Sequence, residues 1–191
     1  MRNFIVKPLI VGFTVTLVTY ALYYLREAES LFGPGTTDYV YGGIELIDGP
    51  SGVSYPYSNF VVIRLSTDTA TDFNHGIYQL AHEVIHVLFA DGKESTSNLE
   101  EGLAIYFSIL VTPRDTNSGV FANSLSSSSK YFHSYELVRK LLEIRPTAII
   151  ELRKIQPVLG KITEKDFLKA NLNIPEDLIK ELLEPIDLGD Q

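Results

Sequence analysis

The stretch YQLAHEVIHVLFADG, residues 78–92, decides how the rest of this sequence is interpreted. It is an apolar run interrupted by two histidines four residues apart, His82 and His86, and by Glu83. Because an α-helix advances ~100° per residue, positions four apart lie about one turn apart on the same face. We therefore expect a helix that ends near Asp91–Gly92, a typical stop signal, and that directs both imidazoles to one point.

The polar side chains of this helix need a partner. Their neighbours are apolar, and a buried imidazole or carboxylate without a partner costs ~1–3 kcal/mol or more. A zinc ion bound by His82 and His86 would satisfy both rings. Glu83, one residue along and set off the ligand line, would then lie where it can touch a water on the metal. The pattern His-Glu-x-x-His thus predicts a zinc site.

A third ligand is expected from the segment TSNLEEGLAIYFSIL, residues 96–110, which contains Glu100 and Glu101. Ser97 and Glu100 fit a capping box, in which Glu100 turns back to the amide at the helix start. Glu101 has no such role and falls on an apolar part of the helix, so we predict it as the ligand. Two histidines and one glutamate leave a fourth position for water, as catalytic zinc requires.

HEVIH followed by EEGLAIY resembles the gluzincins, zinc metallopeptidases whose glutamate ligand comes from a second helix, and EGLA is similar to the Asn-Glu-Gly-Phe-Ala motif of the M1 aminopeptidases. The resemblance covers about residues 59–110. It implies that His82, His86 and Glu101 are ligands and that Glu83 is the general base. It also implies that NFVVIRLST, residues 59–67, is an edge strand that pairs with an extended peptide. The sequence departs from the aminopeptidases in its shorter spacing between the two motifs and in having Glu100 where they have Asn.

Gluzincins stabilise the oxyanion of the reaction with a Tyr or a His. The segment SKYFHSYELVRKLL, residues 129–142, offers Tyr131, His133 and Tyr135 near the start of a helix. Tyr135 and His133 are the leading candidates. The alternative is that Tyr131 and Tyr135, which share helical spacing with Val138, are simply core residues.

Two further residues, Glu45 and His75, are weaker candidates for the site. YGGIEL, residues 41–46, faintly resembles an exopeptidase motif, with Glu45 as a carboxylate that binds the substrate amine, although turn glycines beside a strand are the commoner explanation. His75 lies two turns before His82, where a surface or capping role is more usual than metal binding.

Composition restricts the class of protein. The chain has 191 residues, 45% of them hydrophobic, which suits one domain with a real core. Its formal charge of −8 gives no cationic field for a phosphate backbone, so no nucleic acid partner is expected. It has no cysteine, which leaves histidines and carboxylates as metal ligands.

The N-terminal region predicts a membrane anchor. From Pro8 to Leu25, 18 residues carry no charge, close to the ~20 that cross a bilayer core. The basic residues Arg2 and Lys7 precede this segment, which favours a single-pass protein with its N-terminus inside and the main domain outside. The alternatives are a cleaved signal peptide, giving a secreted protein, and a buried segment of a soluble domain.

The expected fold class is α+β, a zincin-like domain with a small mixed sheet, a zinc-binding helix and a glutamate helix. We predict a hydrophobic segment over 1–30, a strand-plus-zinc-helix subdomain over 31–112, a polar loop over 113–130 and a helical subdomain over 131–191. Within the last, helices are expected over 131–145, 147–155, 163–172 and 175–184.

The function predicted from these features is that of a zinc-dependent metallopeptidase acting on a peptide or protein substrate. The alternative is a catalytically inactive, membrane-anchored zincin-like domain that binds a peptide or a partner. A third reading is a membrane-anchored scaffold in which the histidines belong to the core.

Overall fold

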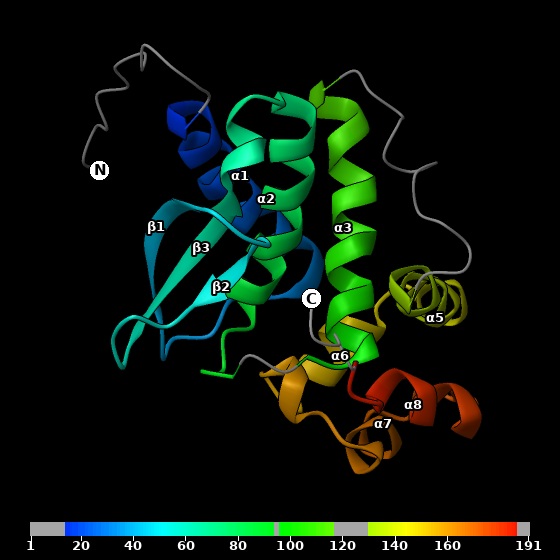
Figure 1. The fold of residues 1–191 in the computed structure, drawn as a ribbon. Helices are drawn as coiled ribbons and strands as arrows, with labels where there is room; N and C mark the ends of the chain where they lie inside the picture. The colour runs from blue at the N-terminus through cyan, green and yellow to red at the C-terminus, as the bar shows by residue number, and fades with distance from the viewer. Residues whose placement is uncertain (1–13, 94–95, 117–129, 187–191) are drawn as a thin grey trace.

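The computed structural model describes residues 14–93, 96–116 and 130–186, which form an α+β domain (Figure 1). These residues contain seven α-helices, two short 3-10 helices and one three-stranded sheet. The elements are α1 (Thr14–Phe32), β1 (Val40–Ile47), β2 (Gly52–Ser54), β3 (Phe60–Ser66), η1 (Thr67–Ala70), α2 (Phe73–Leu88), α3 (Asn98–Thr116), α5 (Lys130–Ile144), α6 (Ala148–Arg153), η2 (Leu159–Lys161), α7 (Glu164–Ala170) and α8 (Glu176–Leu183).

The sheet has the order β1-β3-β2, with β1 parallel and β2 antiparallel to β3. Along β3, Val61, Ile63 and Leu65 are buried and the residues between them are more exposed, so one face of the sheet packs on the core. The expectation that residues 59–67 form an edge strand is wrong, because β3 is central. The reason is that β2, only three residues long, folds back and pairs with Val62–Arg64.

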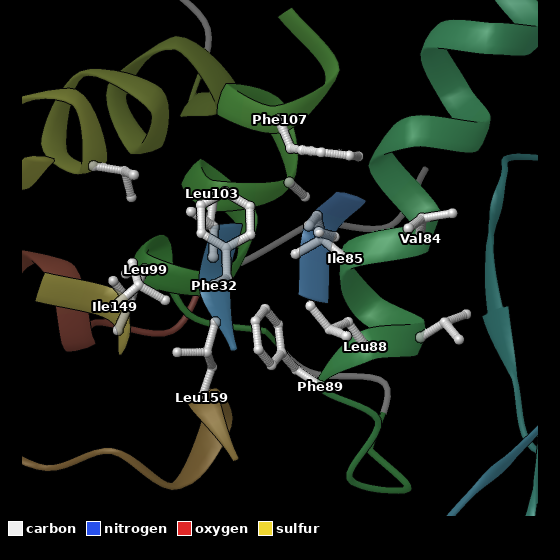
Figure 2. Packing of buried hydrophobic residues seen from close by; sticks show 14 of the residues in the cluster. Phe32, Val84, Ile85, Leu88, Phe89, Leu99, Leu103, Phe107, Ile149 and Leu159 are labelled. Carbon is white, nitrogen blue, oxygen red and sulfur yellow. The ribbon is translucent and has the colours of Figure 1, made fainter. Parts of the chain in front are cut away.

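The helices α2 and α3 lie side by side next to the sheet, and α5 lies on the far side of α3 (Figure 1). The C-terminal helices α6, α7 and α8 gather at the lower end of this view, near the start of α3. Figure 2 shows how the core joins these elements. Phe32 of α1, Ile85 of α2, Phe107 of α3, Ile149 of α6 and Leu159 of η2 are all buried within it.

The N-terminal helix α1 packs into this core along one face. Leu17, Ala21, Tyr24 and Ala28 are fully buried and follow the spacing of one helical stripe. Residues 8–13 of the expected membrane span lie outside the described residues. Within residues 14–93, 96–116 and 130–186, no helix has the length and apolar character needed to cross a bilayer. Attachment to a membrane stays a prediction.

The glutamate helix is longer than expected. It continues through Pro113 to Thr116, so the first part of the predicted 113–130 loop is helical, and residues 117–129 lie outside the described residues. Proline removes one hydrogen bond of the helix, and only a last turn follows it here, which limits the cost. The four helices expected in the C-terminal region are present, each within a few residues of its expected bounds.

Candidate metal centre

Helix α2 presents one partly exposed stripe. Its start is capped by Asp72, whose side chain accepts a hydrogen bond from the His75 amide at 3.1 Å. From Ile77 to Leu88 every residue is buried except four, which lie at helical spacing on one side. These are Tyr78, Gln79, His82 and His86. Because the rest of the helix is packed in the core, both histidines are directed out of it to one side.

His82, His86 and Glu101 converge as predicted, and together they form a group that can hold a metal ion. The Nε2 atoms of the two histidines are 3.3 Å apart. The Glu101 carboxylate lies 3.1 Å from Nε2 of His82 and 3.5 Å from Nε2 of His86. Ligand atoms ~2.05 Å from a tetrahedral zinc ion are about 3.3 Å from one another. The two Glu101 distances are to different oxygens, Oε1 for His82 and Oε2 for His86, and one donor atom from each of the three residues lies within 4.8 Å of the others, as a shared metal ion requires.

Glu100 has a second role that the sequence did not reveal. Half of the expected capping box is present, since the Glu100 amide donates to the Ser97 hydroxyl at 3.4 Å. The Glu100 carboxylate instead accepts a hydrogen bond from Nδ1 of His86 at 2.8 Å. A hydrogen bond at Nδ1 leaves Nε2 as the metal-binding atom and orients the ring. The only hint in the sequence was a second carboxylate directly before the ligand.

The protonation states of Glu101 and His86 depend on burial and on the charged side chains close to them. Burial by itself would raise the pKa of Glu101, but the neighbouring His82 and His86 lower it far more, so the carboxylate is anionic. Burial opposes protonation of His86, yet its hydrogen bonds to Glu100 and Glu101 raise its pKa well above the usual value. A cation at this point would therefore be held by a charged carboxylate and would compete with a proton for His86.

Glu83 is buried next to the candidate ligands. The residue is only 3% exposed, and burial raises the pKa of its carboxyl, with the nearby histidines opposing the shift. Among the described residues no hydrogen-bond or ion-pair partner of the Glu83 side chain is present. A buried carboxylate without a structural partner is costly, and such groups are concentrated at functional sites.

The predicted oxyanion donors lie on α5, and their described contacts are with other groups. Nε2 of His133 lies 3.5 Å from the Glu181 carboxylate on α8, and the His133 side chain is 55% exposed. The Tyr135 ring stacks on Tyr106 with centroids 6.5 Å apart. Within the described residues, these contacts of His133 and Tyr135 do not involve His82, His86 or Glu101. Both assignments stay predictions.

The two weaker candidates lie elsewhere. Glu45 of β1 is paired in register with Arg64 of β3, 3.8 Å away, and is largely exposed. Because Ile63 and Leu65 point into the core, Arg64 and Glu45 lie on the opposite face of the sheet, away from α2. The proposed amine-binding role of Glu45 is therefore wrong. His75 forms a hydrogen bond with Gln79 at 3.2 Å and is outside the metal-binding group.

The helix that carries Glu101 is held by a tight contact with α5. A Cβ atom at Gly102 would lie 2.1 Å from the Ser134 carbonyl oxygen, so only glycine allows this approach. The Ser134 hydroxyl donates to the Asn98 side chain at 2.7 Å, and the Asn98 amide nitrogen Nδ2 donates to the Glu181 carbonyl at 2.9 Å. These contacts fix the start of α3, and thereby the position of Glu101.

No protein-family model, curated protein or solved structure matches this chain. What the fold and site define is an α+β domain with a His2Glu group able to hold a metal ion. The function is therefore argued from the chemistry of that site.

Proposed function

We propose that the protein is a zinc-dependent metallopeptidase. The observation that carries the proposal is the arrangement of His82, His86 and Glu101, each of which offers a donor atom within 4.8 Å of the others. Two imidazoles and one carboxylate match catalytic zinc sites, which keep a fourth position open. Glu83, buried beside this group, supplies the base that a merely structural metal site would not need.

Different residues of the chain have separate roles in the proposed hydrolysis. Zinc held by the three ligands would polarise the substrate carbonyl and lower the pKa of a water molecule. Glu83 accepts the proton of the attacking water and later transfers it to the leaving amine. The raised pKa of Glu83 suits this role, because a base that acts near neutral pH must hold a proton once it has taken it. Glu100 keeps the His86 ring in place through its Nδ1 hydrogen bond.

An extended peptide is the substrate shape that the sheet favours. The strand expected to bind the peptide, β3, has neighbours on both sides and cannot pair with a further strand. The neighbouring strand β2 lies at an edge of the sheet instead. Among the described residues no strand pairs with the outer edge of β2, so a peptide could add there by main-chain hydrogen bonds.

Zinc content and turnover of matched variants test this proposal. The purified protein is expected to hold about one equivalent of zinc and to lose it in His82→Ala. Glu83→Gln should keep zinc but lose cleavage of casein or of a peptide library by about 10²–10⁴-fold. Glu45→Gln, a change on the opposite face of the sheet, is the control and should leave both unchanged.

The outcomes separate the candidate functions. Zinc binding without any cleavage by the wild-type protein would point instead to an inactive zincin-like domain that binds a peptide or partner. A protein that takes up no zinc, with or without His82→Ala, would contradict the metal site itself.

A further inference from the structure

We infer that two copies of this chain associate, with Leu168 of α7 in one copy inserted into a groove between α5 and α8 of the other. Both surfaces belong to the C-terminal helices (Figure 1). One is an exposed leucine with lysines beside it, and the other is an apolar groove with carboxylates along its rim. The inference is independent of the proposed metallopeptidase function.

The groove between α5 and α8 has a volume of about 460 Å³. Its apolar lining consists of Leu137 and Ile144 from α5 and of Pro175 and Leu178 at the start of α8. Leu137 and Leu178 are nearly buried, whereas Ile144 is 47% exposed. Volumes of ~300–1,000 Å³ are typical of sites that bury an apolar group. The groove therefore has room for an apolar side chain from outside.

The charged residues that line this groove are mostly acidic. Asp177 and Glu181 of α8 and Glu143 of α5 supply three carboxylates, against one ammonium group, that of Lys140. Glu143 is held by an ion pair within α5. Glu181 lies 3.5 Å from His133, which is charged only when protonated. Asp177 has no ion-pair partner among the described residues. Such a groove favours an apolar side chain that is carried by a cationic segment.

Helix α7 presents a side chain of this kind. Leu168 is 75% exposed, more than any other large hydrophobic residue in the part of the chain that the structure describes. Lys165 precedes it by three residues and so lies on the same side of the helix, and Lys169 directly follows it. Both lysines are exposed, and Lys169 also pairs with Asp166 at 3.2 Å. Leu168 is thus an apolar side chain in a cationic surrounding.

The charges on the two surfaces have the same spacing. Lys165 and Lys169 are four residues apart on α7, as Asp177 and Glu181 are on α8. Each pair therefore spans about 6 Å along its helix axis. The chain has a formal charge of −8, so two copies repel one another overall, and a contact between them needs opposite charges locally. Lysines facing carboxylates meet this need.

Within one copy, α7 packs on the core through Phe167, which is 2% exposed, and this leaves Leu168 directed outward. The leucine and the groove are different surfaces of the same chain. Two copies can therefore exchange the contact reciprocally, with each copy supplying one leucine and one groove. This arrangement closes a two-fold dimer.

Sedimentation velocity of the full-length protein at a series of concentrations tests the inference. The wild type is expected to associate reversibly, and less strongly as salt is added, because salt screens the opposite charges. Leu168→Asn should raise the dissociation constant by about tenfold or more. Asp177→Lys should act similarly from the side of the groove. Leu110→Asn, which replaces a 49% exposed leucine of α3, is the matched control and should leave association unchanged.

A mixture of two variants gives a stricter test. Leu168→Asn keeps the groove and Asp177→Lys keeps the leucine, so the mixture should associate more strongly than either variant alone. Far-UV circular dichroism shows whether each variant is folded. A mixture no stronger than its components, or equal weakening by Leu168→Asn and Leu110→Asn, would overturn the inference. A wild type that stays monomeric up to about 1 mM would overturn it as well, since a different partner would then have to fill the groove.

Discussion

Glu100 shows how much one side chain can add to a metal site. Its backbone serves the helix start, where the amide binds Ser97, while its carboxylate accepts from Nδ1 of His86 at 2.8 Å. The other oxygen, Oε2, lies close to Gly160, where an added Cβ would be 3.6 Å away. Glu100 therefore lies between His86 of the candidate metal centre and Gly160 of η2.

We expect Glu100→Ala to weaken zinc binding by about 10–100-fold, because the His86 ring loses the acceptor that orients it. Competition with a chelator of known affinity measures the change. Glu100→Gln keeps a neutral acceptor at the same position and should recover much of the affinity. Equal zinc affinity in wild type and Glu100→Ala would show that the ring is oriented by packing alone.

At the scale of elements, the site depends on how closely α3 meets α5. Gly102 directly follows Glu101 of the candidate metal centre, and α5 approaches it with its backbone. The helices are held at this point by the buried hydrogen bond between Ser134 and Asn98. A change at the contact should therefore affect both stability and metal binding.

Gly102→Ala is predicted to destabilise the protein by at least about 1–3 kcal/mol, since the new methyl group would force the two helices apart. It should also weaken zinc binding, because Glu101 moves with α3. Urea unfolding and chelator competition give the two values. Gly52→Ala in β2, where an added Cβ meets no atom within 4 Å, is the control. If Gly102→Ala were as stable as that control, α3 and α5 would not be in the close contact described here.

A second contact between elements joins α1 to α3. Tyr24 of α1 donates to the Asp115 carboxylate at 2.8 Å, and Arg114 pairs with Asp115 at 2.8 Å and with Glu27 of α1 at 2.7 Å. Burial would raise the pKa of Asp115, but the hydrogen bonds from Arg114 and Tyr24 lower it below the usual range. The folded protein therefore favours the charged form of Asp115.

This shift predicts a specific acid sensitivity. Because the folded-state pKa is lowered, the stabilisation is complete above about pH 4 and is lost as the pH falls through the lowered pKa. Asp115→Asn should lower the free energy of unfolding by about 1 kcal/mol at neutral pH. The variant should also lose less stability than wild type on acidification. Urea titrations at a series of pH values give the free energy of unfolding of both proteins as a function of pH. Parallel curves for wild type and Asp115→Asn would contradict the lowered pKa of Asp115.

At the scale of the whole molecule, Arg153 connects helix α6 with the segment that follows α1 and with the end of α2. This residue of α6 is 7% exposed. It donates to the carbonyl groups of Phe32, at 2.7 Å, and of Pro34, and lies over the Phe89 ring at 4.5 Å from the centroid. Burial lowers its pKa to about 10, so it keeps its charge at neutral pH. The segment after α1, the end of α2 and the C-terminal helices are thus joined around one cation.

Removal of this cation is expected to weaken the fold as a whole. Arg153→Met should lower the free energy of unfolding by about 3 kcal/mol, because several buried carbonyl groups lose their donor. Arg145→Met, which breaks an exposed ion pair with Glu151, should change it by only about 0–1 kcal/mol. Urea unfolding followed by circular dichroism measures both variants, and equal values for the two would contradict the central role of Arg153.

The sequence by itself determined the helices of the candidate site and the three residues that come together in it. Helical periodicity aligns His82 with His86, and an acidic residue on an apolar helix marks Glu101, because both features depend on positions within a turn or two of each other. Only the tertiary structure decided that β3 is central, that Glu45 faces away from the site, and that Glu100 binds His86. These relations depend on how separate elements pair and pack, and long-range packing leaves no local pattern in the chain.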